Sequence, residues 1–165
     1  MKKKLLFGVI CAVLIFVAVL ILFLGRSEAV DPQHAAYREE IQAALKEHGL
    51  DPSIAPSWYP EGYTLESVQV IDLDSGTILH AWMSKEDDGL GFQYTRADDP
   101  ALIDSYHLEK DECPPIVRES NGRTFHIFHN INSLTATWSD GLDMILIYGP
   151  LSIEDMEKII DAIGG

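Results

Sequence analysis

The order of apolar and polar positions divides the chain into four stretches. Leu5–Leu24 is a continuous apolar run without charge. Apolar residues then recur at spacings of three and four between residues 31 and 49, alternate with polar residues between 63 and 148, and return to spacings of three and four after residue 152. Helices repeat every 3.6 residues and strands every two. The pattern therefore predicts an apolar helix, an amphipathic helix, a β-region and a second amphipathic helix.

The apolar run predicts a transmembrane helix. Its twenty residues, at about 1.5 Å each, span about 30 Å, which is the thickness of the hydrocarbon layer. Lys2, Lys3 and Lys4 precede it, and positively charged flanks stay in the cytoplasm. We expect residues 1–4 to be a cytoplasmic tip, residues 5–24 to cross the cell membrane once, and the rest to be extracytoplasmic.

A cleaved signal peptide is the alternative to a retained anchor. The apolar core of a signal peptide is about 7–15 residues long, shorter than this run. Ser27-Glu28-Ala29 nevertheless places small residues at the spacing that signal peptidase requires. The sequence therefore favours the anchor and leaves cleavage open.

The first amphipathic helix is predicted to begin at Asp31, a favoured N-cap residue, with Pro32 in its first turn. Gly49 is predicted to end it. Its apolar face is expected to contain Tyr37, Ile41, Ala44, Leu45 and His48. Asp51–Pro60 contains three prolines and is predicted to be irregular. We group residues 25–55 as a juxtamembrane helix and linker.

The alternating stretch predicts an antiparallel meander of about six or seven strands. The expected strands are Tyr63–Ile71, Thr77–Ser84, a strand containing Leu90, Phe92 and Tyr94, then Ile116–Glu119, Arg123–Asn130, Leu134–Ser139 and Met144–Tyr148. Turns are expected at Asp72–Gly76, Asp88-Gly89, Asn121-Gly122 and Asp140-Gly141. The polar segment Arg96–Pro115 is predicted to be irregular.

The last helix is predicted to begin at Ser152, with Asp155 completing a near capping box, and to end at Gly164. Its apolar stripe is expected to be Ile153, Met156, Ile159, Ile160 and Ile163. The fold class that follows is α+β, an antiparallel meander sheet with an N-terminal and a C-terminal helix packed on it, after one transmembrane helix. Residues 56–165 are the predicted extracytoplasmic domain.

Charge narrows the possible partners. The chain has 12 basic and 26 acidic residues and a net charge of −14. Three of the basic residues precede the apolar run, which leaves 9 basic against 26 acidic residues, a charge of −17, in the rest. Such a surface repels nucleic acid and anionic lipid headgroups. We expect a membrane association through the first helix alone, no nucleic-acid partner, and a preference for cationic partners or ions.

The sequence predicts no catalytic, cofactor-binding or metal-binding residues. Asp72, Asp74 and Gly76 resemble the beginning of a calcium loop, but Gly76 is in fifth rather than sixth position, and Met83 occupies the twelfth position, where Glu is required. His126 and His129 have an odd spacing that places them on opposite faces of a strand. No recognised nucleophile, nucleotide-binding or metalloprotease motif occurs. We therefore expect a protein that is not an enzyme.

Three further groups of residues need interpretation. Cys11 lies in the apolar run and Cys113 lies outside it, so the two cannot form a disulfide together if the run is in lipid. Clusters such as Glu86-Asp87-Asp88 are expected to be solvated, and weak calcium binding is the alternative. The aromatic residues are most simply core, but some could form a partner or ligand surface. The candidates for that surface are Trp58, Tyr59, Trp82 and Tyr94.

Two segments resemble a known family. Pro56-Ser57-Trp58-Tyr59-Pro60-Glu61-Gly62-Tyr63 is similar to the entry motif of the domain of unknown function family numbered 4367. Asn121-Gly122, Thr137-Trp138 and Ile147–Asp155 are similar to its closing segment. The resemblance covers about Pro56–Gly165. It implies a Gram-positive cell-envelope location, either as a membrane-anchored domain or as the outer part of anti-sigma-factor-like proteins, and it supplies no catalytic residues.

We expect the protein to function as a non-catalytic binding or sensing module on the outer surface of the cell membrane, with a protein or an envelope polymer as partner. The alternative is a carrier or chaperone for an apolar envelope ligand held in a concave sheet. An apolar cavity of several hundred Å³ would favour the carrier. The chain lacks the cytoplasmic sigma-binding segment of the anti-sigma-factor-like proteins, so the sequence leaves open whether it takes part in sigma-factor signalling.

Overall fold

A computed structural model describes residues 31–104 and 114–164. The described residues all belong to one compact unit. None of the helices in this described part is long and apolar enough to cross a membrane. The predicted span Leu5–Leu24, Cys11 and Cys113 lie outside the described residues.

The first described element is α2 (Pro32–Glu47), which begins as predicted. The side chain of Asp31 accepts a hydrogen bond from the backbone N–H of Gln33 (2.9 Å) and so caps the helix. Gly49 follows the helix with a φ of +69°, a conformation that glycine adopts without strain. The buried face is narrower than predicted, because Ala44 is only partly buried and His48 is exposed, with Nδ1 3.3 Å from a carboxylate oxygen of Asp72.

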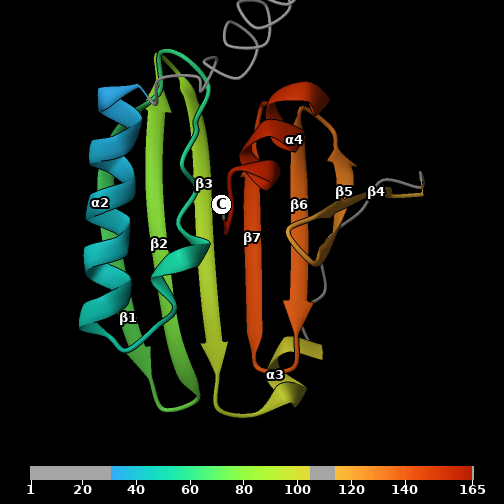
Figure 1. Ribbon diagram of the computed structural model, residues 1–165. Coiled ribbons are helices and arrows are strands. Elements are labelled where there is room, and N and C mark those ends of the chain that lie inside the picture. The colour runs from blue at the N-terminus through green and yellow to red at the C-terminus, as the bar shows by residue number, and fades with distance from the viewer. Residues whose placement is uncertain (1–30, 105–113, 165) are drawn as a thin grey trace, which may run out of the picture. The chain divides into compact units, whose positions relative to one another are not determined.

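Seven strands form one antiparallel sheet. They are β1 (Thr64–Leu73), β2 (Gly76–Lys85), β3 (Asp88–Ala97), β4 (Ile116–Ser120), β5 (Arg123–Asn130), β6 (Ser133–Asp140) and β7 (Asp143–Gly149). Their spatial order is β1-β2-β3-β7-β6-β5-β4. The sheet therefore consists of a three-stranded and a four-stranded meander, joined at the centre where β3 pairs with β7 (Figure 1). The predicted α+β meander is confirmed, and its strand number is seven.

Several local predictions are wrong. The turn expected over Asp72–Gly76 is confined to Asp74-Ser75, and the stretch Asp51–Pro60, expected to be irregular, contains a 3-10 helix at Pro52–Ile54. The turn expected at Asp88-Gly89 lies at Glu86-Asp87, and Gly89 instead pairs with Ser84 within the sheet. The turn expected at Asp140-Gly141 lies one residue later, because Asp140 still pairs with Asp143. The stretch Arg96–Pro115, also predicted to be irregular, contains the end of β3 and the short helix α3 (Pro100–Asp104). A helix of five residues is too short to show a helical period in the sequence.

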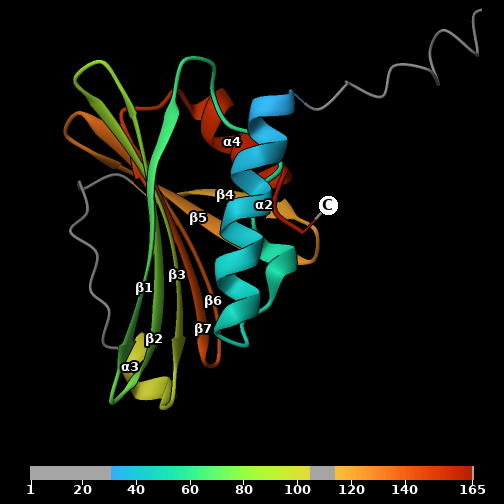
Figure 2. The same ribbon diagram turned by 90° about the vertical axis from the view of Figure 1, so that its left-hand side faces the viewer.

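Two longer helices cover one face of the sheet, whereas the short helix α3 packs Ile103 against Ala97 and Met144 at one end of the other face. Figure 2 shows α2 and α4 (Ile153–Asp161) on the same side, together with the 3-10 helix η1 (Pro52–Ile54). We call the covered side the helix face and the other the open face. Strand residues of the helix face share one core with the two helices, including Leu79, Ala81, Met83, Phe92, Tyr94, Phe125, Ile127, Ala136, Ile145 and Ile147. The remaining alternate positions of the strands belong to the open face.

The C-terminal helix α4 closes this core. Ser152 accepts a hydrogen bond from the backbone N–H of Asp155 (3.1 Å) and donates one to its carboxylate (2.8 Å), which confirms the predicted cap. Met156, Ile159, Ile160 and Ile163 are buried. Ile153, predicted in the same stripe, is 38% exposed, because it begins the helix where the chain has just left the sheet.

Candidate functional site

Two rows of side chains cross the open face without a charged residue. Strand pairing places the members of each row next to one another. The first row contains Gln69, His80, Gln93, Leu146, Thr137, His126 and Val117. The second contains Ser67, Trp82, Gly91, Tyr148, Thr135 and Phe128. Leu146, Thr135 and Phe128 of these rows are buried. The other members present uncharged hydroxyl, amide, imidazole, aromatic and aliphatic groups on a chain with a net charge of −14.

Three of these side chains form what we call the aromatic platform: His80, Trp82 and Tyr148. The rings of His80 and Tyr148 are stacked, with centroids 6.2 Å apart and planes 4° from parallel. His80 Nε2 lies 2.9 Å from the Tyr148 hydroxyl, which is hydrogen-bonding distance. The centroid of Trp82 lies 6.4 Å from that of Tyr148. Partial burial lowers the pKa of His80, which favours its neutral form.

Glycines of β3 make room for the platform. A Cβ atom at Gly89 would lie 2.1 Å from the indole of Trp82, and one at Gly91 would lie 2.3 Å from the ring of Tyr148. The two aromatic rings therefore lie across bare backbone. A glycine within a strand is typical of such a close approach. It also explains why Gly89 is part of the strand rather than of a turn.

The open face also has a hollow over β5 and β6, with a volume of about 330 Å³. Hydroxyl groups of Thr124, Thr137 and Ser139 line it together with the imidazole of His126. Trp138 and Asp140 also contribute to its walls. Most of the side chains that line this hollow are neutral hydrogen-bonding groups.

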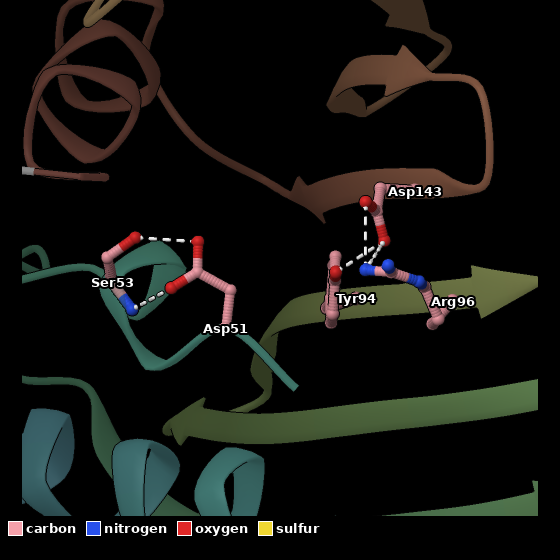
Figure 3. A network of polar contacts seen from close by, with 5 residues as sticks. All are labelled: Asp51, Ser53, Tyr94, Arg96 and Asp143. Atoms are coloured by element: carbon pink, nitrogen blue, oxygen red, sulfur yellow. Dashed lines mark hydrogen bonds and ion pairs between the residues drawn. The ribbon is translucent and has the colours of Figure 1, made fainter. Parts of the chain in front are cut away.

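A second cavity, which we call the polar cavity, has a volume of about 360 Å³ and contains charged side chains of the helix face. On its sheet side, the Tyr94 hydroxyl donates to a carboxylate oxygen of Asp143 (2.5 Å), and Arg96 Nη1 contacts both oxygens of that carboxylate (3.0 and 3.1 Å). Figure 3 shows these three side chains meeting, with Asp51 and Ser53 on the segment facing them. Burial and the hydrogen bond to Asp143 raise the pKa of Tyr94 to about 12.

Arg123 occupies another wall of the polar cavity. Its guanidinium carbon lies 5.1 Å from the ring centroid of Trp138, a cation–π contact. A Cβ at Gly164 would lie 2.6 Å from Arg123 Nη1, so the guanidinium also packs against the end of the chain. None of the ion pairs found in the described part of the chain includes Arg123.

Residues 53–163 match the family described as Domain of unknown function (DUF4367). The chain belongs to this family. The match confirms the resemblance seen in the sequence and spans the complete sheet and α4, whereas α2 precedes it. A comparison with curated proteins finds no match. Membership of DUF4367 does not by itself assign a reaction or a ligand.

Within the DUF4367 domain, the four aromatic residues predicted to form a partner surface do not lie together. Tyr59 and Tyr94 are 1% and 2% exposed and belong to the core under the helices. Trp58 is partly buried beside them, and Lys158 Nζ lies 5.5 Å from its ring centroid. Trp82 lies on the open face. Of the four, Trp82 joins the aromatic platform and Tyr94 lines the polar cavity.

Most of the residues that form these sites in the DUF4367 domain of this chain were not predicted from the sequence. His80 and Tyr148 are 68 positions apart in the chain and meet only because β2, β3 and β7 are neighbours. Arg96 and Asp143 are joined by the same β3–β7 pairing. The signal that could have indicated the platform is the Gly89-Leu90-Gly91 repeat in a strand. Among residues 31–104 and 114–164, the structure has no group of three or more His, Cys, Asp or Glu placed to hold a metal.

Proposed function

We propose that this protein is a single-pass membrane-anchored, extracytoplasmic and non-catalytic module that binds a neutral, hydroxyl-rich polymer of the cell envelope on its open face. The observation that supports this most is the lack of charge on the two central rows of the open face in a strongly acidic chain. The apolar run and its three preceding lysines support the anchored, outward orientation.

The chemistry of the open face fits a sugar polymer. Sugar rings have apolar C–H faces that pack on aromatic rings and hydroxyl groups that exchange hydrogen bonds with hydroxyl and amide side chains. The platform supplies the rings, and Gln69, Gln93 and Thr137 in the neighbouring row supply the polar groups. Because these residues lie on paired strands, little conformational entropy is lost on binding.

Other partners fit less well. An anionic polymer would meet a charge of −17 in the region beyond the apolar run. The cores of protein–protein interfaces are depleted in serine and typically rich in larger apolar contacts, whereas much of this face carries hydroxyl groups. A carrier of an apolar ligand would need an apolar cavity, and neither of the two cavities described above has predominantly apolar walls.

The test is cosedimentation of the full-length protein, in detergent micelles, with insoluble polymers of glucose and of N-acetylglucosamine. We expect at least one polymer to retain the protein. Trp82→Ala should weaken retention about tenfold, since stacking and burial of one aromatic ring contribute about 1–2 kcal/mol. Trp58→Ala is the matched control on the helix side of the sheet.

Both variants must keep a cooperative thermal transition for the comparison to count. Equal loss of retention in Trp58→Ala and Trp82→Ala would contradict a role for the open face. Failure of both polymers to retain the wild-type protein would contradict a neutral glycan as partner.

A further inference from the structure

We infer that the polar cavity is a second binding site, separate from the open face, for a small zwitterionic ligand such as an amino acid or a short peptide. The ligand's carboxylate would pair with Arg123, and its ammonium group would lie at the aspartates of the same cavity. This inference does not depend on the proposed function, since it concerns the helix face of the sheet and a different class of ligand.

Arg123 is the residue of the polar cavity best suited to bind a carboxylate of a ligand. Its guanidinium carbon lies 5.1 Å from the ring centroid of Trp138, and Nη1 lies close to the backbone at Gly164. No carboxylate of the described residues lies within ion-pair distance of it, although acidic residues outnumber basic ones by 26 to 12 in the chain. Arginine presents a planar fork of donors that matches a carboxylate.

The carboxylates of the cavity are not equivalent. Asp143 is occupied by Arg96 and Tyr94. Asp51 accepts hydrogen bonds from the backbone N–H and the hydroxyl of Ser53 (2.9 and 2.8 Å). Asp140 is exposed and takes part in none of the ion pairs between described residues. An ammonium group beside Asp140 would pair with a carboxylate that has no cationic partner in the described part of the chain.

The net charge of the cavity walls favours a zwitterionic ligand over a simple anion. The cavity walls hold three aspartates and two arginines, a net charge of −1. A dianion such as phosphate would gain Arg123 but would face all three carboxylates. A ligand with one positive and one negative group adds no net charge and can satisfy Arg123 and Asp140 together. The volume of about 360 Å³ is at the small end of ligand pockets, which are about 300–1,000 Å³.

The experiment is calorimetric titration of the full-length protein in detergent with alanyl-alanine, its N-acetyl derivative, its C-terminal amide and inorganic phosphate. We expect binding of alanyl-alanine and about tenfold weaker binding of each blocked derivative, because each derivative loses one charge-assisted contact. Arg123→Gln should weaken alanyl-alanine binding by a similar factor. Lys46→Gln, which makes the same change of charge at an exposed position of α2, should leave it unchanged.

Asp140→Asn provides a second variant at an exposed position. It should weaken the binding of alanyl-alanine and leave that of N-acetyl-alanyl-alanine unchanged, since the latter has no ammonium group. No detectable heat with alanyl-alanine, or equal binding of the blocked derivatives, would overturn the inference. Tighter binding of phosphate than of alanyl-alanine would replace the zwitterion with a simple anion as the ligand.

Discussion

The buried tyrosines Tyr59 and Tyr94 differ in whether their hydroxyl groups have a hydrogen-bond partner. The hydroxyl of Tyr59 is buried and has no hydrogen-bond partner in the described part of the chain, and burial raises its pKa. The hydroxyl of Tyr94 donates to Asp143. A buried polar group without a partner costs about 1–3 kcal/mol, whereas a hydrogen bond to a charged group contributes about as much.

We therefore expect Tyr59→Phe to leave the free energy of unfolding unchanged or to raise it by about 1 kcal/mol. Tyr94→Phe should lower it by about 1–2 kcal/mol, since Asp143 loses a donor. Urea unfolding of the full-length protein in detergent measures both. A loss of stability in Tyr59→Phe as large as that in Tyr94→Phe would mean that the Tyr59 hydroxyl has a partner.

His80 of the aromatic platform should make the stability of the protein depend on pH. Partial burial lowers the pKa of His80 below its value in the unfolded chain, about 6.5. The unfolded state therefore binds a proton more readily, and the stability due to neutral His80 is present above about pH 6.5 and is lost as pH falls towards the folded pKa. Wild type should lose more of its melting temperature between pH 7.5 and pH 5.5 than His80→Gln does. An equal loss in both would show that His80 does not carry this dependence.

At the scale of an element, two isoleucines of α4 allow the effects of a buried and an exposed side chain on stability to be compared. Ile160 is fully buried, whereas Ile153 is 38% exposed. Ile160→Ala should lower the free energy of unfolding by about 2–5 kcal/mol, because it leaves a cavity in the core. Ile153→Ala should cost less than about 1 kcal/mol. Thermal and urea unfolding of the two variants measure the difference, and equal costs would contradict the orientation of α4.

The β5–β6 hairpin contains an unfavourable residue at its tip. Ile131 has a φ of +46° and its side chain is 92% exposed. A β-branched residue in the left-handed region costs about 1–2 kcal/mol, which asparagine partly avoids. Ile131→Asn should raise the free energy of unfolding by about 1 kcal/mol. Lower stability in this variant, measured by urea unfolding, would mean that the Ile131 side chain makes a contact that outweighs the strain.

The elements were largely predictable because their information is local. The alternation of apolar and polar residues predicted the strands. Asp31 and Ser152 indicated where the two amphipathic helices begin. The displaced turn at Gly89 was not predictable from local preference, because that glycine is required by the indole of Trp82 on the neighbouring strand. The sites were not predictable for the same reason, since pairing between distant strands brings their residues together.

For the whole molecule, the main prediction is the orientation of the domain. We expect a cysteine at position 43, introduced by Ala43→Cys in a chain whose Cys11 and Cys113 are serine, to react with a membrane-impermeant maleimide on intact cells. Ala43 is exposed on α2, so folding does not hide it. Labelling only after lysis would reverse the orientation. Release of the labelled domain into the medium, without an N-terminal tag, would indicate a cleaved signal peptide instead.

The strand order also determines when the sheet can be completed. β7 is the last strand in the chain but lies at the centre of the sheet, between β3 and β6. Until β7 has been synthesised, β3 and β6 each present an unpaired edge, and such edges pair readily with other chains. A chain that stops before residue 143 would therefore leave two separate meanders with unpaired edge strands. Chains that stall before β7 should consequently be aggregation-prone.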